Sequence, residues 1–193
     1  CHEVEWGTTV LTHWERIKAA ERMQAYIEAH LGEKITMAAL ARAACYSQWH
    51  AARIFKEVTG NSPFEYIRLR RLSAAAQALS YAKAHVGYAY VWAAAGPSAF
   101  DCSGLMVAAY QSAGVSIPHS SATLSQMYTP VSRADLRPGD LIFWYSPVHH
   151  VAMYEGNGMM VHAQNSKVGV VETPVDQWIG WGIPYSGARR VVG

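Results

Sequence analysis

The sequence predicts an α+β protein in which an all-helical N-terminal part is joined, through one continuous helix, to a part with helices packed on an antiparallel sheet. Two observations support this prediction. Residues 14–86 are rich in Ala, Leu, Arg and Glu and contain one proline, Pro63, whereas Gly, Pro, Ser and Val dominate afterwards. Beyond Gly114, short β-rich runs are separated by Gly, Pro and Asn. We therefore expect a helical subdomain over residues 1–79 and a second domain over residues 80–193.

The composition is that of a globular protein. Of the 193 residues, 51% are apolar and 16% are charged, which excludes the disordered class. No apolar run approaches the roughly 20 residues that a membrane-spanning helix needs, and no signal peptide is recognisable. The net charge of +2 is too small to indicate a nucleic-acid partner by itself.

The three cysteines, Cys1, Cys45 and Cys102, lie far apart and match neither a disulfide framework nor a zinc motif. Because their number is odd, at least one thiol is expected to be free. Cys1 is compatible with the lipid-bearing residue of a processed lipoprotein or with an arbitrary chain boundary, and the true N-terminus is left open.

Three helices are expected in the first part, and their apolar residues recur at helical spacing. The expected ranges are 17–31, 37–44 and 48–58. Thr36 and Ser47 are suited to cap the second and third of these helices. Two short helices joined by a turn of three or four residues predict a helix-turn-helix, whose second helix enters the major groove of DNA.

Three stretches of this part carry a family pattern, namely Tyr46 to His50, Arg53 to Pro63 and Tyr66 to Arg71. They resemble the first half of an AraC-type DNA-binding domain over about residues 17–79. The resemblance implies that Gln48, Trp49 and Arg53 contact DNA, since Arg can bond a guanine edge in two places and Trp can pack on a thymine methyl.

The chain departs from the AraC pattern in two ways. The family's domain holds two helix-turn-helices, whereas this chain leaves the pattern after the first, and much of the affinity for DNA would be lost with the second. Cys45 also stands at a turn position where relatives often carry glycine. The alternative is a helical bundle that does not bind DNA.

One long helix is expected over about residues 63–86. Ser62 suits its N-cap, Pro63 its first position and Glu65 its third position. No Gly or Pro follows until Gly87. The two parts would share this helix, so the chain looks like a fusion of two modules, natural or engineered.

Cys102 lies in the stretch Phe100 to Gly104, directly before an apolar run that Gly114 closes. We expect it in the first turn of a helix of roughly three turns. Unpaired N–H groups and the positive pole of the helix dipole at such an end stabilise a thiolate and lower its pKa. The alternative is a small buried cysteine of the core.

A nucleophilic cysteine needs a base and a group that orients the base. The candidates are His119, His149, His150 and His162. Strands are expected at 140–145, 150–155, 159–163 and 168–172. A three-residue loop between the second and third strands would place His150 opposite His162, whereas a two-residue loop without a bulge would turn His162 to the other face.

Six stretches of the second part carry a further family pattern. They are Tyr90 to Trp92, Phe100 to Leu105, Ser120-Ser121, Leu136 to Phe143, His150 to Tyr154 and Met160 to Ala163. Together they resemble the NlpC-type family of cell-wall cysteine peptidases, which share a papain-like fold, over about residues 74–193. In two places the chain departs from the family, with Ala89 at a common proline and Ala93-Ala94 at a common glycine pair.

The resemblance implies that Cys102 is the nucleophile, His150 the base and His162 the group that holds the base. It also implies that four residues bind the free amino end of a stem peptide or line the oxyanion site, namely Tyr90, Asp101, Ser103 and Ser121. An acid there suits an ammonium group. No metal or cofactor is implied.

The expected function is that of a cysteine endopeptidase of peptidoglycan stem peptides, usually cutting the bond from D-glutamate to the diamino acid. One alternative is a transcription regulator whose C-terminal part senses or binds a cell-wall peptide. Others are an amidase or acyltransferase on the same Cys-His-His triad, and a zinc site of Cys102, His150 and His162. A peptidase module is expected in the cell envelope or outside the cell, and a DNA reader in the cytoplasm.

Overall fold

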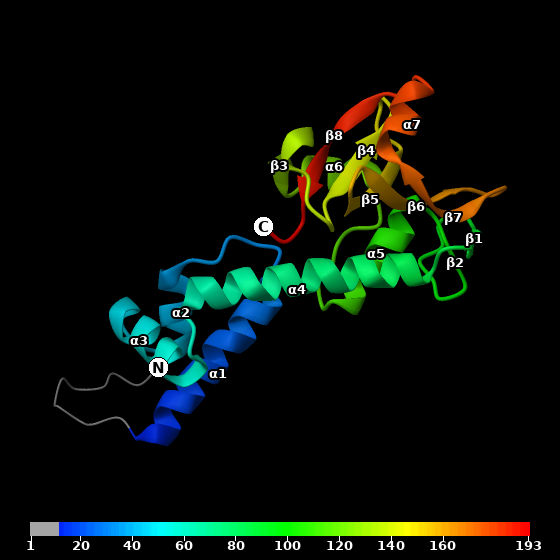
Figure 1. The fold of residues 1–193 in the computed structure, drawn as a ribbon. Helices are drawn as coiled ribbons and strands as arrows, with labels where there is room; N and C mark the ends of the chain where they lie inside the picture. The colour runs from blue at the N-terminus through cyan, green and yellow to red at the C-terminus, as the bar shows by residue number, and fades with distance from the viewer. Residues whose placement is uncertain (1–11) are drawn as a thin grey trace. The chain divides into compact units, whose positions relative to one another are not determined.

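The structure is a computed structural model and describes residues 12–193, so the expectations attached to Cys1 lie outside the described residues. The chain has the predicted α+β fold and divides into two compact units between Arg70 and Arg71 (Figure 1). This division falls inside helix α4 (Pro63–Ala84), which runs on through it without a break. Among the described helices, none combines the length and the apolar character needed to cross a bilayer.

The first unit consists of helices around a small apolar core. It contains α1 (His13–Ala29), α2 (Met37–Ala44), α3 (Gln48–Thr59) and the first part of α4. The side chains of Thr12, Thr36 and Ser47 accept backbone N–H bonds at the starts of the first three helices. Fully buried side chains from these helices fill the core, and the largest are Met23, Ile27, Leu40, Ile54 and Phe55. The predicted helices are confirmed to within a few residues at their ends.

Helices α2 and α3 form the predicted helix-turn-helix. Cys45 ends α2 in the left-handed region, with φ 62° and ψ 39°. This conformation costs a non-glycine residue about 1–2 kcal/mol, which explains why glycine suits the position. The second unit's share of α4 buries Ala74, Ala78 and Ala82, as expected of a helix that packs on small residues.

The second unit is built on a six-stranded sheet with the order β3-β8-β4-β5-β6-β7, in which all neighbours are antiparallel. The strands are β3 (Thr129–Val131), β4 (Leu141–Trp144), β5 (His150–Gly156), β6 (Met159–Asn165), β7 (Gly169–Pro174) and β8 (Tyr185–Arg190). Helix α5 (Cys102–Ser112) packs against β5 and β6. A core cluster of this unit includes Ile142, Trp144, Met160 and Trp178.

The remaining elements of the second unit are short. They are β1 (Ala89–Tyr90), which pairs in parallel with β2 (Ala99–Phe100), α6 (Ser121–Gln126), a 3₁₀ turn (Arg133–Asp135) and α7 (Val175–Gly180). The predicted strands correspond to β4–β7, whereas β1, β2, β3 and β8 were not predicted. Strand β8 lacks an apolar run, and its Arg190 instead forms a two-fold ion pair with the buried Asp140 at 2.8 and 2.7 Å.

The hairpin of β5 and β6 contains a bulge. Met153 pairs with Val161 and Tyr154 with Met160, but Gly156 then pairs with Met159, which leaves Glu155 as the extra residue. Because of this bulge, His150 and His162 lie on the same face of the sheet. The bulge alternative is confirmed, whereas direct pairing of the two histidines is wrong: they are diagonal neighbours, since His162 comes opposite Ala152 in this register.

Gly104 lets the start of α5 lie against the loop before β2. A Cβ at this position would lie 2.0 Å from the carbonyl oxygen of Ala94. The same oxygen accepts a hydrogen bond from the backbone N–H of Asp101 at 2.8 Å. The loop and the helix are therefore held together at a distance that only glycine permits.

We predict that Gly104→Ala lowers the free energy of unfolding of the second unit by about 3 kcal/mol or more, because the clash is with backbone and can be relieved only by moving the helix. Chemical denaturation followed by tryptophan fluorescence measures the change. Gly180→Ala is the matched control, since a Cβ there meets nothing within 4 Å. Equal stability of the two variants would contradict the role given to Gly104.

Candidate active site

Cys102 is the first residue of α5, as the sequence predicted, and its neighbour Asp101 caps the helix. The Asp101 side chain accepts a hydrogen bond from the N–H of Gly104 at 2.6 Å. Cys102 is only 6% exposed, and its Sγ donates a long hydrogen bond of 3.9 Å to the carbonyl oxygen of His149. The thiol thus lies at a helix start, where backbone N–H groups face it.

The pKa of the Cys102 thiol is nevertheless raised above its ordinary value. Burial is the largest cause, and the negative charge of Asp101 adds to it, while the backbone N–H groups of Val151 and Ser103 oppose it in part. The expectation of a lowered pKa at the helix start is therefore not met. The thiol is neutral at rest and needs a proton acceptor to become a nucleophile.

A line of three hydrogen-bonded side chains leads away from the Cys102 region. His150 Nε2 lies 2.8 Å from His162 Nδ1, and His162 Nε2 lies 2.8 Å from Thr173 Oγ1. His150 is 6% exposed and His162 is fully buried. The Nδ1 atom of His150 is left as the ring nitrogen that can receive a proton.

Both histidines are neutral at ordinary pH. Burial is the main reason that the pKa of His150 is well below its usual range, and the neighbouring His162 and His149 lower it further. Burial also lowers the pKa of His162 to about 3. Neutral imidazole can act as a base or as a hydrogen-bond acceptor, whereas imidazolium can only donate.

Whether the Thr173 hydroxyl donates or accepts its hydrogen bond decides which ring nitrogen of His162 and of His150 carries the proton. If it accepts from the Nε2–H of His162, then His162 Nδ1 accepts from His150 Nε2–H, and His150 Nδ1 keeps a free lone pair. If the hydroxyl donates instead, the order reverses and His150 Nδ1 carries the proton. Only the first arrangement leaves His150 able to accept a proton through Nδ1.

Trp178 holds both imidazole rings from one side. It stacks on His150 at 4.9 Å between ring centroids and meets His162 edge-on at 4.8 Å. Since Trp178 is 2% exposed, it seals the two rings from water. Trp178 thus belongs to the core cluster and also packs on the two histidines.

Both carboxylate oxygens of Asp101 have partners among the described residues. Its Oδ2 accepts from the N–H of Ala93 at 2.9 Å, and its Oδ1 accepts from the hydroxyl of Ser103 and the N–H of Gly104 and lies 2.8 Å from His119 Nε2. These contacts concentrate on Oδ1, so Oδ2 keeps a second acceptor position. His119, one of the four histidines considered as the base, is a partner of Asp101.

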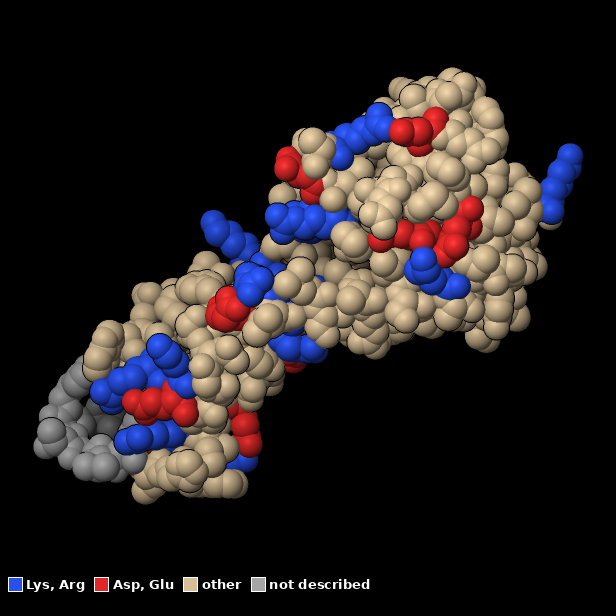
Figure 2. All heavy atoms as spheres, in the orientation of Figure 1, with Lys and Arg blue, Asp and Glu red and all other residues tan. Residues whose placement is uncertain are grey.

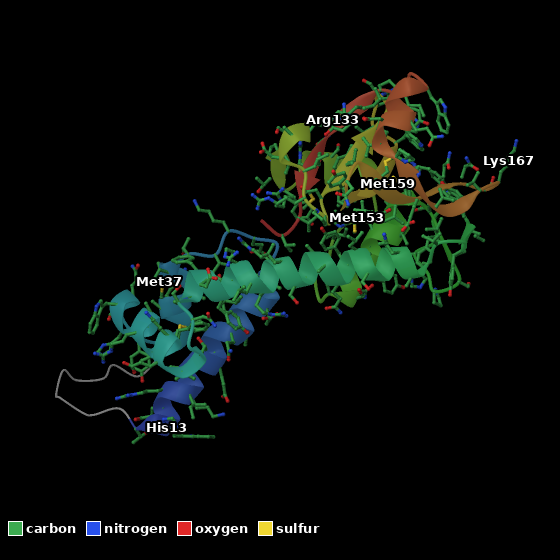
Figure 3. The ribbon with its side chains drawn as sticks, in the orientation of Figure 1. His13, Met37, Arg133, Met153, Met159 and Lys167 are labelled. Atoms are coloured by element: carbon green, nitrogen blue, oxygen red, sulfur yellow. The ribbon has the colours of Figure 1, made fainter. Side chains whose placement is uncertain are left out.

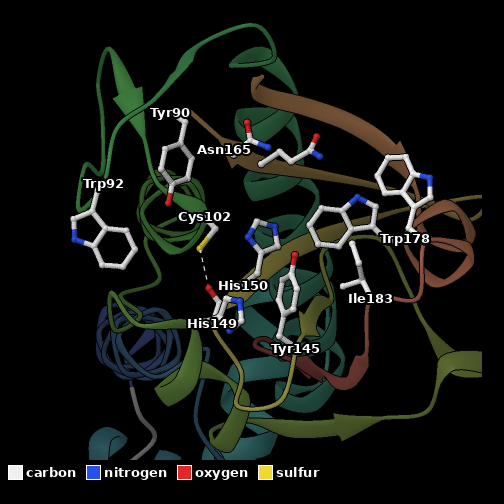
Figure 4. A pocket seen from close by; sticks show the side chains of 11 residues that line it. Tyr90, Trp92, Cys102, Tyr145, His149, His150, Asn165, Trp178 and Ile183 are labelled. Atoms are coloured by element: carbon white, nitrogen blue, oxygen red, sulfur yellow. Dashed lines mark hydrogen bonds between the residues drawn. The ribbon is translucent and has the colours of Figure 1, made fainter. Parts of the chain in front are cut away.

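A pocket of about 440 Å³ opens in front of Cys102, and we call it the Cys102 pocket (Figure 4). It is lined by Tyr90, Trp92, Cys102, Tyr145, His149, His150, Gln164, Asn165, Trp178, Trp181 and Ile183. Of the site residues predicted from the sequence, Tyr90, Cys102 and His150 line it. His162, Asp101 and Ser103 lie behind these as partners, and Ser121, in the first turn of α6, is not among the lining residues.

His149 and His150 have different roles in the architecture. His149 stacks on Tyr145 at 4.0 Å at the pocket wall, and its ring Nδ1 lies 3.0 Å from the carbonyl oxygen of Pro147. Within residues 12–193, no group of three His, Cys, Asp or Glu side chains is arranged to hold a metal ion.

The three residues expected to contact DNA lie on α3 of the first unit and are all exposed. Trp49 is 67% exposed, and the guanidinium of Arg53 lies over its ring at 4.7 Å. Arg53 also pairs with Glu57 at 3.5 Å. On the face shown in Figure 2, basic and acidic side chains are interspersed over the helices of this unit.

Residue-by-residue reasoning missed Thr173, the partnership of His119 with Asp101, and the two amides that line the pocket, Gln164 and Asn165. Thr173 follows His162 by eleven residues and carries no motif of its own. One signal could have found it, because the β6–β7 hairpin pairs His162 with Val171 and thereby brings position 173 to the same face.

Comparison with known proteins assigns a family to each part of the chain. Residues 87–183 match the model of the NlpC/P60 family, and residues 40–96 match a helix-turn-helix domain model. A protein named probable endopeptidase Rv2190c from Mycobacterium tuberculosis is 45% identical over 91 residues, covering 47% of this chain and 24% of the relative. One named probable endopeptidase Cgl2188 from Corynebacterium glutamicum is 43% identical over 95 residues, covering 49% and 46%. The match thus spans between about a quarter and a half of these curated relatives.

Solved structures agree with this assignment. An NlpC/P60 family protein from Bacillus cereus is 35% identical with a TM-score of 0.58, over 62% of this chain and 40% of that one. The NlpC/p60 domain of the peptidoglycan hydrolase SagA is 32% identical with a TM-score of 0.52, over 60% and 97%. These similarities confirm the predicted fold class.

We predict that Thr173→Val destroys the fixed proton arrangement of the two histidines, because valine has the shape of threonine without its hydroxyl. Nitrogen-15 NMR of the imidazole rings measures this directly, with His162 of the unaltered protein expected as a single tautomer protonated on Nε2. The variant should show mixed or reversed tautomers and lose about 1–3 kcal/mol of stability through the unpaired nitrogen. Thr173→Ser retains the hydroxyl and should keep the original spectrum. Identical ring shifts in all three proteins would contradict the assignment.

Proposed function

Because the chain belongs to the NlpC/P60 family, we propose that it is a cysteine peptidase that hydrolyses an amide bond in the stem peptides of peptidoglycan. The observation that carries the proposal is the line of hydrogen bonds from His150 through His162 to Thr173, together with the fact that His150 and the buried Cys102 line the same pocket. Relatives named as endopeptidases and the similarity to a domain of a peptidoglycan hydrolase support the reaction class.

The proposed reaction begins with proton transfer from the Cys102 thiol to Nδ1 of His150. The thiolate adds to the carbonyl carbon of the amide, and the backbone N–H groups at the start of α5 stabilise the resulting oxyanion. His150 then gives its proton to the leaving amine as the C–N bond breaks. Water, deprotonated by His150, hydrolyses the thioester and releases the acid and the free thiol.

His162 and Thr173 act on the ring of His150 rather than on the substrate. The hydrogen bond from His150 Nε2 to His162 fixes the ring plane and supports the positive charge that His150 carries after accepting the proton. Because both imidazole rings are buried against Trp178, water does not compete for the hydrogen bond between His150 and His162. The two residues are thus positioning residues in this proposal.

For the bond cleaved, we propose the amide from D-glutamate to the diamino acid. Tyr90 lines the Cys102 pocket, and in this proposal it contacts the free amino end of a short stem peptide. Asp101 would favour an ammonium by its charge, with Ser103 and His119 keeping its carboxylate in place. Ser121 is proposed as a further contact that forms with substrate present.

A second function, DNA binding by the first unit, is supported by the helix-turn-helix match and by the exposure of α3. We propose that Gln48, Trp49 and Arg53 form a small contact surface of this kind. With one helix-turn-helix and interspersed charges, the binding would be weak and would rest on few phosphate contacts.

For the peptidase proposal, we predict that the protein releases fragments from stem peptides and that Cys102→Ala abolishes the release, because no other described group in the pocket can form the thioester. Mass spectrometry of muropeptides incubated with each protein measures the products. His149→Ala is the comparison variant, and it should retain cleavage because its ring is not part of the line from His150 to Thr173. Equal cleavage by the unaltered protein and Cys102→Ala would refute the proposal.

For the DNA proposal, we predict that Arg53→Gln weakens DNA binding, because Arg53 is the basic residue of the three proposed contacts. Gel shifts at several salt concentrations measure both affinity and the number of phosphates contacted. Lys18→Gln on α1 removes one charge elsewhere in the same unit and serves as the control. Absence of any shift at low salt, or equal binding by both variants, would count against DNA binding through α3.

A further inference from the structure

The described residues that line the Cys102 pocket include no Lys, Arg, Asp or Glu. Its walls are aromatic, with Tyr90 and Trp92 on one side and Tyr145 and Trp178 on the other (Figure 4). The polar groups at its end are two neutral carboxamides, those of Gln164 and Asn165 at the end of β6. The end of the pocket at Gln164 and Asn165 is therefore suited to a neutral polar group of the ligand.

The two carboxamides are available for such a ligand. The Asn165 Oδ1 accepts hydrogen bonds from the N–H groups of Lys167 at 2.9 Å and Val168 at 3.2 Å. This fixes the orientation of the Asn165 amide and leaves its NH₂ group as a donor. Among the described residues, the half-buried Gln164 has no hydrogen-bond partner for either end of its amide, so both a donor and an acceptor are available.

The charges near the pocket disfavour an anion. Asp101 precedes Cys102 in the chain. Burial is the main reason that the pKa values of Cys102 and Tyr90 are raised, and the negative charge of Asp101 adds to the rise in both. The basic residue nearest to Asn165 in the sequence, Lys167, points away from the sheet into solvent (Figure 3). A carboxylate that entered the pocket would lose hydration without gaining a cation, which is costly.

We propose that the Cys102 pocket selects peptides in which the carboxyl group beside the attacked amide is present as a carboxamide, and that Gln164 and Asn165 recognise this carboxamide. The inference rests on the proposed peptidase function and names its substrate class. A glutamyl residue linked through one carboxyl group keeps the other, which is either a carboxylate or a carboxamide. The carboxamide supplies donors and an acceptor that match those of Gln164, whereas the carboxylate only accepts and brings a charge.

The experiment compares two synthetic stem peptides that differ only in this carboxyl group, one with a free carboxylate and one with a carboxamide. Cleavage by the full chain is followed by mass spectrometry, and binding to Cys102→Ala is followed by calorimetry. We expect the carboxamide peptide to be favoured on the order of tenfold or more in kcat/KM and in affinity. Equal values, or a preference for the carboxylate peptide, would overturn the inference.

Gln164→Lys tests where the selection arises. A lysine at this position supplies the missing cation and should reduce or reverse the preference by improving the carboxylate peptide. Gln164→Leu is the uncharged control, which should weaken binding of the carboxamide peptide without favouring the carboxylate. If both variants remain folded by circular dichroism and still prefer the carboxamide peptide to the same degree, Gln164 does not recognise this group of the substrate and the inference fails. Should Gln164→Lys not fold, Asn165→Asp provides the opposite test, because an added negative charge should enlarge the preference.

Binding and cleavage separate this inference from the function on which it rests. If neither peptide is cleaved but Cys102→Ala and the unaltered protein bind the carboxamide peptide preferentially, the pocket selects as inferred and the peptidase proposal is wrong. If both peptides are cleaved at equal rates, the peptidase proposal stands and the selection is wrong. If neither peptide binds, the pocket does not take this class of ligand.

Discussion

The carboxylate of Asp101 is the interaction on which the site depends. It caps α5 through the N–H of Gly104, holds the loop at Ala93 and engages Ser103 and His119. These contacts fix the start of α5, and with it Cys102, against a loop that approaches closely because position 104 has no side chain. The same charge that organises the helix start also opposes thiolate formation next to it. The Asp101 carboxylate therefore stabilises the structure of the site and at the same time disfavours the thiolate form of its cysteine.

The parts of the structure that follow local rules could be predicted from the sequence. Cap residues such as Thr36 and Ser47 and helical spacing of apolar residues define the helices of the first unit, because these signals act within a few residues. Strands β4–β7 could be predicted in the same way, because each contains a short run of β-favouring residues bounded by turn residues. Motif order singled out Cys102, His150 and His162 as candidates, and the expected hairpin needed either a bulge or an odd-length loop to bring the two histidines to one face of the sheet. The bulge at Glu155 is one of those two solutions.

The remaining features depend on contacts between distant segments, for which the sequence has no local signal. Strand β8 pairs with β3 and β4 although it lacks an apolar run, and its Arg190 forms an ion pair with Asp140, 50 positions away. Thr173 lies beside His162 because β6 pairs with β7. The pKa of Cys102 depends on how deeply the helix start is buried, so the rule for exposed helix ends predicted the wrong direction.

A neutral cysteine beside a neutral histidine has a consequence for when the nucleophile forms. Separating charge between two buried groups is unfavourable without a compensating dipole. The free pocket therefore holds the thiol protonated and unreactive. In the proposed reaction, a carbonyl group that occupies the pocket takes the negative charge from sulphur onto an oxygen facing backbone N–H groups, and His162 supports the positive charge on His150. Charge separation would then accompany bond formation, so that under this proposal the substrate itself completes the conditions under which Cys102 reacts.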